Sequence, residues 1–231
     1  MNCYCYETEE DFILCVENAE VECEEIILHA WFEKTANGYI KTYPMKNGID
    51  KLWYKKTEDK ELIKENFARL GPTMFNGAFE WKNVLLTLAE RFFESGIEWY
   101  IFGSSSETVL GVDIKPNDID IIVHTKDFYK VKEIFPNNIV EPFVDNKDTW
   151  LVRYFGRLCV GGAIVDIVAS DKMNMGNHHY DKVLWNGFEV LIEPFQTRYT
   201  LETNRNRPHR LKAMEEYMKR TQQGFSAVPW C

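Results

Sequence analysis

Three aspartates stand within apolar runs of this chain, where a carboxylate is hard to explain by structure alone. Asp118 and Asp120 flank Ile119 ahead of the apolar run 121–123, and Asp166 lies inside the apolar run 163–169. Successive side chains of a strand point to opposite faces, so Asp118 and Asp120 are expected on one face, about 6–7 Å apart along the strand. Two carboxylates this close repel each other unless one is protonated or a cation lies between them.

The pair therefore predicts a cation site, and Mg²⁺ is the cation that fits it best. Mg²⁺ prefers oxygen ligands and is usually held by one or two carboxylates together with substrate phosphates. Two such ions can hold both the attacking and the leaving oxygen of a displacement. Asp166 taken alone fits a solvent-facing position equally well, and only its similarity to the pair makes it a candidate third ligand.

A Gly-Ser turn stands just before this acidic pair. The apolar run 99–102 leads into Gly103-Ser104, and a short helical pattern follows to Leu110. Glycine lets a ligand approach the backbone closely, and the free N–H groups of a helix N-terminus attract anions such as a triphosphate. Ser104 and Glu107 form a capping-box pattern. Glu107 either folds back onto this cap, which leaves the anion site intact, or points outward and repels phosphates.

Part of the chain resembles a family signature: Gly103-Ser104, then a short helix, then the run Lys115–Asp120. The DNA polymerase β-like nucleotidyltransferase superfamily has Gly-Ser or Gly-Gly, then Asp-apolar-Asp, and a third carboxylate on a later strand, which Asp166 matches. The likeness covers residues 97–168 and is greatest for the small-molecule branch, the aminoglycoside and lincosamide nucleotidyltransferases.

The resemblance implies the following site. Metal ligands and catalytic residues would be Asp118, Asp120 and Asp166, with Asp166 acting as a ligand or as general base. Nucleotide-binding residues would be Gly103, Ser104, Ser105, Lys115 and Arg207. The phosphates also need basic partners, and the candidates besides Lys115 are Arg205, Arg207, Arg210 and Lys212. A solvated start of a helix explains this basic cluster equally well.

The implied reaction uses Mg²⁺, with two ions in the family pattern, and an NTP as co-substrate. It transfers NMP to a hydroxyl of a small molecule, for example an antibiotic, and releases pyrophosphate. Two alternatives stay open. One is a toxin–antitoxin-type nucleotidyltransferase that modifies tRNA or protein, and the other is a catalytically inactive nucleotide-binding module.

Charge and composition bear on the partners. The net charge is −9, and residues 1–33 contain ten acidic residues and no Lys or Arg. Because nonspecific binding of nucleic acid depends on Lys and Arg that neutralise phosphates, we expect a small acceptor and no nucleic-acid partner. No secretory signal and no apolar run near the ~20 residues of a membrane span are visible, so we expect a cytoplasmic protein with reduced cysteines. The oligomeric state is left open.

The element pattern predicts a fold in the α/β to α+β range, with a mixed sheet flanked by helices. We expect an N-terminal α+β segment over 1–78, of unknown role, and a nucleotidyltransferase-like domain with C-terminal helices over 79–231. Expected helices span 58–70, 79–94, 105–110, 126–135, 195–203 and 210–221. Expected strands span 12–16, 39–43, 97–102, 118–123, 150–155, 158–168, 183–185 and 189–192, with hairpin turns at 156–157 and 186–187, whereas 20–32 fits helix or strand.

Overall fold

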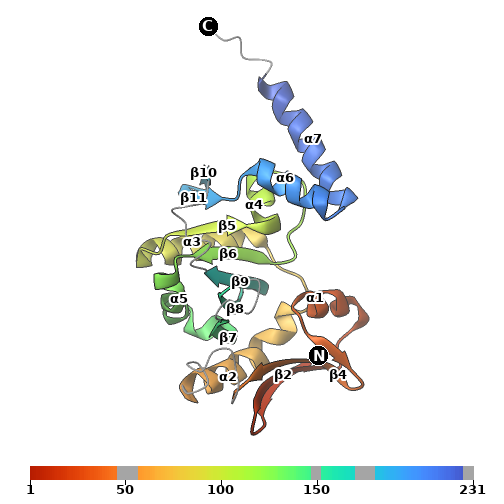
Figure 1. Ribbon diagram of the computed structural model, residues 1–231, viewed down its shortest axis with the longest axis vertical. Helices are drawn as coiled ribbons and strands as arrows, with labels where there is room; N and C mark the ends of the chain where they lie inside the picture. Colours follow the sequence, from red (N-terminus) through yellow and green to blue (C-terminus); the bar gives the residue numbers. More distant parts are fainter. Residues whose placement is uncertain (46–56, 147–151, 170–179, 226–231) are drawn as a thin grey trace.

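The computed structural model describes residues 1–45, 57–146, 152–169 and 180–225. The described residues form a mixed α+β fold with two sheets, which confirms the fold class expected from the sequence. In Figure 1 the smaller sheet lies at the bottom, the larger sheet in the middle, and the C-terminal helices at the top.

The N-terminal segment is a four-stranded antiparallel sheet with one short helix. Its order is β1-β2-β4-β3, from β1 (Asn2–Glu7), β2 (Asp11–Glu17), β3 (Glu33–Thr35) and β4 (Gly38–Pro44). The ambiguous stretch after β2 forms a 3₁₀ turn, η1 (Val21–Cys23), and α1 (Glu24–His29). Ile27 of α1 and the middle of β2 are buried, and they belong to one apolar core that continues through α2 into the larger sheet.

Two helices connect the sheets. α2 (Thr57–Met74) packs against β1 on one side and against β7 of the larger sheet on the other, and α3 (Trp81–Ser95) covers the larger sheet. The expected end of α2 at Gly71-Pro72 was wrong. Pro72 lies in the last turn of the helix, and a side chain at Gly71 would overlap Cys3, so close packing against β1 explains the glycine. The proposed domain division at residue 78 falls between α2 and α3.

The larger sheet has seven strands in the order β10-β11-β5-β6-β9-β8-β7. The strands are β5 (Trp99–Phe102), β6 (Ile119–Val123), β7 (Ile139–Asp145), β8 (Tyr154–Val160), β9 (Ala163–Ala169), β10 (Asp181–Trp185) and β11 (Phe188–Ile192). β6 pairs with β9 in parallel, and β5, β8 and β7 complete the centre in antiparallel pairs. The hairpin at 186–187 is confirmed, but the one at 156–157 was wrong, because Gly156 and Arg157 lie inside β8 and the turn is at Gly161-Gly162.

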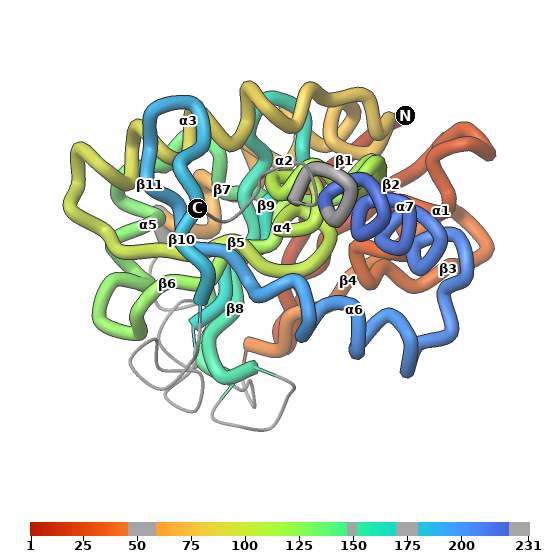
Figure 2. Tube along the Cα trace, turned by 90° about the horizontal axis from the view of Figure 1, so that it is seen from above, coloured from red at the N-terminus to blue at the C-terminus, as the bar shows by residue number. Residues whose placement is uncertain are grey.

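The remaining helices lie around this sheet. α4 (Gly103–Leu110) follows β5, and α5 (Phe128–Ile134) follows the 3₁₀ turn η2 (Thr125–Asp127), while η3 (Pro136–Asn138) precedes β7. α6 (Phe195–Asn204) and α7 (Pro208–Phe225) end the described chain. Seen from above in Figure 2, they lie toward the same side as α1, with the β10–β11 hairpin toward the other.

The cysteines at 3, 5, 15, 23 and 159 are free thiols. Within the described ranges, none of the helices combines the length and apolarity that crossing a membrane would need.

Candidate active site

A row of charged side chains crosses the centre of the larger sheet. Asp120 of β6 is paired with Asp166 of β9, Asp166 with Arg157 of β8, and Arg157 with Glu141 of β7. Directly opposed residues of neighbouring strands share a face of the sheet, so these four side chains line up on one face. Strand pairing therefore assembles the site from segments up to 46 positions apart in the chain.

The three predicted aspartates meet at one end of this row. Asp118, Asp120 and Asp166 each offer a carboxylate oxygen, and these oxygens lie within 4.8 Å of one another. Asp118 and Asp166 are buried, and Asp120 is partly buried. Burial, together with the carboxylates of Asp118 and Asp166, holds the pKa of Asp120 well above its usual value. A divalent cation would relieve this repulsion, and oxygen ligands at this spacing fit Mg²⁺.

The Gly103 turn lies directly against this cluster. Gly103 has φ +66°, and a Cβ atom there would overlap Oδ2 of Asp120, so only glycine lets the turn pass this close to the carboxylate. The helix α4 begins at Gly103 with Phe102 as its N-cap and no side-chain cap, so the expected N-cap at Ser104 was wrong. The Ser105 hydroxyl is buried and donates to the Asp118 carbonyl at 3.0 Å, which ties α4 to the loop carrying the aspartates.

Arg157 is the buried cation of the row, and the sequence analysis missed it. Its Nε and Nη2 donate to Oδ1 and Oδ2 of Asp166 at 2.6 and 2.9 Å, and its Nη1 donates to Glu141 at 2.7 Å. Burial raises the pKa of Asp166, although Arg157 opposes the shift. A carboxylate offers about four lone-pair sites, so Asp166 can accept both Arg157 bonds and still ligate a cation. A charged residue in the otherwise apolar run of β8 was the available signal.

The N-terminal sheet supplies the partners at the other end of the row. Lys41 and Tyr43 of β4 donate to Oε2 of Glu141 at 2.6 and 2.5 Å. Burial raises the pKa of Glu141, but Arg157 and Lys41 outweigh it and hold this pKa below its usual value. Burial also lowers the pKa of Lys41 to about 8. These contacts join the segment of unknown role directly to the charged row.

His29 at the end of α1 reaches the aspartates themselves. Its Nε2 lies 2.9 Å from Oδ2 of Asp118, and this hydrogen bond, with the nearby Asp118 and Asp166 charges, raises the pKa of His29. No pattern around His29 in the sequence predicts this contact, because α1 and the aspartate loop are 89 positions apart.

Glu107 neither caps α4 nor points outward, so both expectations for it were wrong. It is buried, and its Oε1 accepts from Nε of Arg198 on α6 at 2.8 Å. Arg198 also donates to Glu202 at 2.5 Å and lies 3.5 Å from Glu193, whose Oε2 accepts from the Gly103 N–H at 3.3 Å. Arg198 therefore neutralises Glu107 and links α6 to the Gly103 turn.

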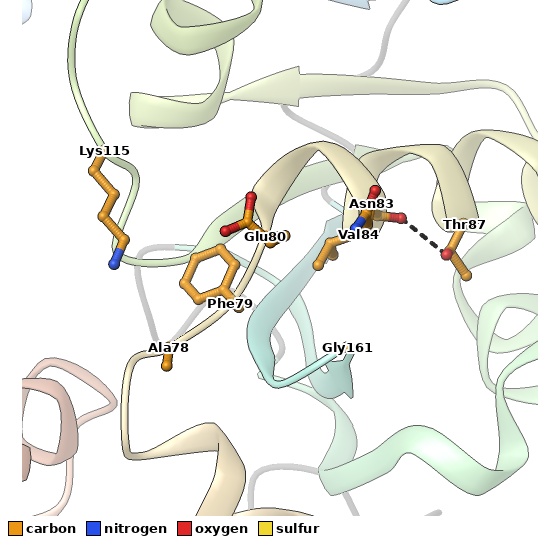
Figure 3. A pocket seen from close by; sticks show the side chains of 8 residues that line it. All are labelled: Ala78, Phe79, Glu80, Asn83, Val84, Thr87, Lys115 and Gly161. Carbon is orange, nitrogen blue, oxygen red and sulfur yellow. Dashed lines mark hydrogen bonds between the residues drawn. The ribbon is translucent and has the colours of Figure 1, made fainter.

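The predicted phosphate-binding cations do not lie together, and Lys212 is exposed on α7, 4.0 Å from Glu216. Arg205, Arg207 and Arg210 gather around the buried Glu202, at 3.5, 3.5 and 3.9 Å, and α6, which carries Glu202, packs on α4. Arg207 keeps an exposed side chain beside this carboxylate. Lys115 instead lines a pocket at the start of α3 and donates to the Gly77 carbonyl at 3.4 Å (Figure 3).

That pocket has a volume of about 590 Å³ and is separate from the carboxylates. Lys115 faces it together with Glu80 and Asn83 of the α3 start, and none of its lining residues belongs to the triad. The Asn83 carbonyl accepts from the Thr87 hydroxyl at 2.9 Å within α3, which is ordinary helix bonding. The triphosphate role expected for Lys115 stays a prediction.

Comparisons with known proteins add weak structural likenesses. No protein-family model matches the chain, and no curated protein matches it. A crystal structure of a candidate nucleotidyltransferase from Thermotoga maritima is similar over 60% of this chain and 92% of its own, at 18% identity and a TM-score of 0.46. A nucleotidyltransferase-like antigenic protein from Paracoccidioides brasiliensis is similar over 58% and 75%, at 15% identity and a TM-score of 0.40.

Proposed function

We propose that this chain is a Mg²⁺-dependent nucleotidyltransferase that transfers NMP from an NTP to a hydroxyl of a small molecule. The observation that carries the proposal is the convergence of Asp118, Asp120 and Asp166 within 4.8 Å, directly against the Gly103 turn that starts α4. A cation site beside a helix N-terminus is the arrangement that a metal–triphosphate needs, because carboxylates hold the metal and N–H groups face the phosphates.

The fit to Mg²⁺ comes from the donors. Asp118, Asp120 and Asp166 offer only oxygens, and burial together with the Asp118 and Asp166 carboxylates raises the pKa of Asp120. When bound, one or two Mg²⁺ ions would neutralise charge on the phosphates and orient them for in-line attack.

The acceptor oxygen would form a bond to the α-phosphorus while the bond to the pyrophosphate oxygen breaks. Asp120 is the better proton acceptor for the attacking hydroxyl, because both oxygens of Asp166 already accept bonds from Arg157. Arg207, together with Arg205 and Arg210 beside Glu202, would bind the leaving pyrophosphate, since guanidinium groups suit oxyanions.

A small and cationic acceptor, such as an amine-bearing sugar antibiotic, fits the surroundings better than a nucleic acid. α1, whose last residue His29 contacts Asp118, has Glu24 and Glu25 in its first turn, and Lys34 pairs with Glu24 at 2.7 Å. Glu25 belongs to the N-terminal segment that has no Lys or Arg before position 34. Negative charge next to the site repels a phosphate backbone and attracts an amine.

The test incubates the full chain with labelled NTPs, Mg²⁺ and three acceptor classes: aminated sugars, bulk tRNA and protein. We expect pyrophosphate release that depends on both Mg²⁺ and an aminated sugar, and its loss in Asp118→Asn and Asp120→Asn with the fold intact. Asp113→Asn, an exposed acid of the same loop, is the control. Transfer of the label to tRNA or protein would reject the small-molecule acceptor and support the toxin–antitoxin-type nucleotidyltransferase instead.

One observation favours the remaining alternative, a catalytically inactive nucleotide-binding module. The bidentate pairing of Asp166 with Arg157 resembles a structural ion pair, which would leave only Asp118 and Asp120 for a metal. Mg²⁺-dependent nucleotide binding in calorimetry without any pyrophosphate release across the acceptor panel would support this module. Absence of nucleotide binding would refute both.

A further inference from the structure

We infer that the turn His29–Trp31 of the N-terminal segment is part of the carboxylate site, and that His29 is a positioning residue for Asp118. The inference rests on the proposed function, because it assumes that Asp118 binds a metal. It gives the N-terminal segment a role that neither its sequence nor its fold assigns by itself.

Asp118 needs positioning because it lies outside the regular sheet. β6 begins at Ile119, so the backbone of Asp118 lies outside the strand's ladder of hydrogen bonds. The Ser105 hydroxyl holds the Asp118 carbonyl, and His29 Nε2 holds the carboxylate through Oδ2 at 2.9 Å. Among the described residues Oδ1 of Asp118 has no hydrogen-bond partner, so this oxygen remains for a cation.

The next residue of the turn contacts the other side of the cluster. The Ala30 carbonyl accepts from Nη1 of Arg157 at 2.8 Å and from Nζ of Lys41 at 3.0 Å. Arg157 in turn holds both oxygens of Asp166. Two consecutive residues, His29 and Ala30, therefore connect the first and the third aspartate of the triad.

Trp31 fixes the turn in a costly conformation. Its φ is +64°, in the left-handed region that bulky side chains rarely adopt. The centroid of the Trp31 ring lies 5.2 Å from the centroid of the Phe155 ring. It also lies 5.2 Å from Cζ of the Arg157 guanidinium. Such strain persists only where the surroundings impose it, and it gathers at functional sites. The turn is thus bound to the charged row at three successive positions.

A neighbour that orients a metal ligand changes metal affinity without touching the metal. Mutation of such partners typically weakens metal binding by about 10–100-fold. Because the His29 side chain is 47% exposed, its bond to Asp118 is partly screened by water, and we expect the lower end of this range, about tenfold.

The experiment measures Mn²⁺ binding to the full chain by electron paramagnetic resonance, with no substrate and no turnover. We expect His29→Ala to bind Mn²⁺ about tenfold more weakly than the wild type. His29→Gln should recover most of the affinity, because its amide nitrogen can reach the position of Nε2. His124→Ala is the matched control, since His124 also pairs with a carboxylate, Glu98 at 3.1 Å, away from the triad.

The outcomes distinguish failure of the His29 positioning role from failure of the proposed metal site. Equal affinity of His29→Ala and wild type overturns the positioning role alone, and tighter binding also overturns it, because His29 would then compete with the metal. If the wild type binds no more Mn²⁺ than Asp120→Asn does, the proposed metal site fails and the positioning role fails with it. Should His29→Ala not fold, His29→Asn replaces it, because its amide is too short to reach Asp118.

Discussion

The substitution Arg157→Met tests whether the charged row is a single buried network. Arg157 is 1% exposed and donates three hydrogen bonds to the carboxylates of Asp166 and Glu141. A methionine keeps similar length but leaves both carboxylates buried without this cation. Removing one partner of a buried ion pair costs about 3–5 kcal/mol of unfolding free energy. We expect a loss in this range, since three charge-assisted bonds disappear together.

The matched control is Arg153→Met. Arg153 also makes two hydrogen bonds to one carboxylate, that of Asp145, at 3.0 and 3.2 Å, but its side chain is 30% exposed. Asp145 is buried, but water reaches the partly exposed Arg153 side chain and screens the pair, so we expect a smaller loss than for Arg157→Met. Urea unfolding followed by circular dichroism compares both variants with the wild type, with the slope on urea checked for constancy.

The pH dependence adds a second check with a definite sign. In the wild type the folded pKa of Glu141 lies below its usual 4.5, so its contribution to stability is present above that pH and is lost as the pH falls. Without Arg157, we expect burial, opposed only by Lys41 and Tyr43, to raise this folded pKa, so the variant is penalised at neutral pH and recovers as the pH falls. The deficit should therefore shrink between pH 7.5 and pH 5. A loss below about 1 kcal/mol at pH 7.5, or one independent of pH, refutes the network.

Three further substitutions test the triad, the Gly103 turn and the proposed phosphate contact of Arg207. Asp120→Asn should raise the melting temperature at pH 7.5 and not at pH 4. The raised folded pKa of Asp120 makes its charged carboxylate destabilising as the pH rises above the unfolded pKa of about 3.8. The same variant should not bind Mn²⁺. Gly103→Ala should cost about 1–3 kcal/mol of unfolding free energy and weaken Mn²⁺ binding. The control is Gly111→Ala, because Gly111 is also left-handed, at φ +94°, but has open space around it. Calorimetry should show unchanged Mn²⁺ binding for this control. Arg207→Ala should weaken NTP binding about tenfold in calorimetry, with Lys219→Ala unchanged, and equal binding would contradict a phosphate role.

Much of the site could be predicted because its chemistry is local in sequence. Gly103, Asp118 and Asp120 fall within 18 positions, and alternation along one strand is enough to place the two carboxylates together. Asp166 needed only the expectation that its apolar run is a neighbouring strand. Pairing of β6 with β9 then brings Asp166 opposite Asp120.

The errors came from residues whose reason lies in a distant partner. Gly156 suggested a turn, but it lies in the middle of β8, where a Cβ atom would overlap the Phe143 ring of β7. Gly71 and Pro72 suggested a helix end for the same reason: the packing of Cys3 against Gly71 cannot be seen in a local pattern. Glycine marks a close approach as often as a turn, and only the neighbouring element tells which.

The strongest unused signal was charge inside apolar strands. Glu141 and Arg157 stand in apolar runs as Asp166 does, and a buried charge requires a partner of opposite sign. Matching opposite charges in these strands would have found the ion pair of Arg157 with Glu141. It would not have found the contact between Lys41 and Glu141, because Lys41 lies 100 positions before Glu141. The row and its neighbours thus contain two cations, Arg157 and Lys41. They also contain four carboxylates, those of Asp118, Asp120, Asp166 and Glu141. Arg157 and Lys41 pair with Asp166 and Glu141, so neither of these two cations neutralises Asp118 or Asp120. Those are the side chains that His29 and the Gly103 turn hold in place, which is why the proposed Mg²⁺ belongs at this end of the row.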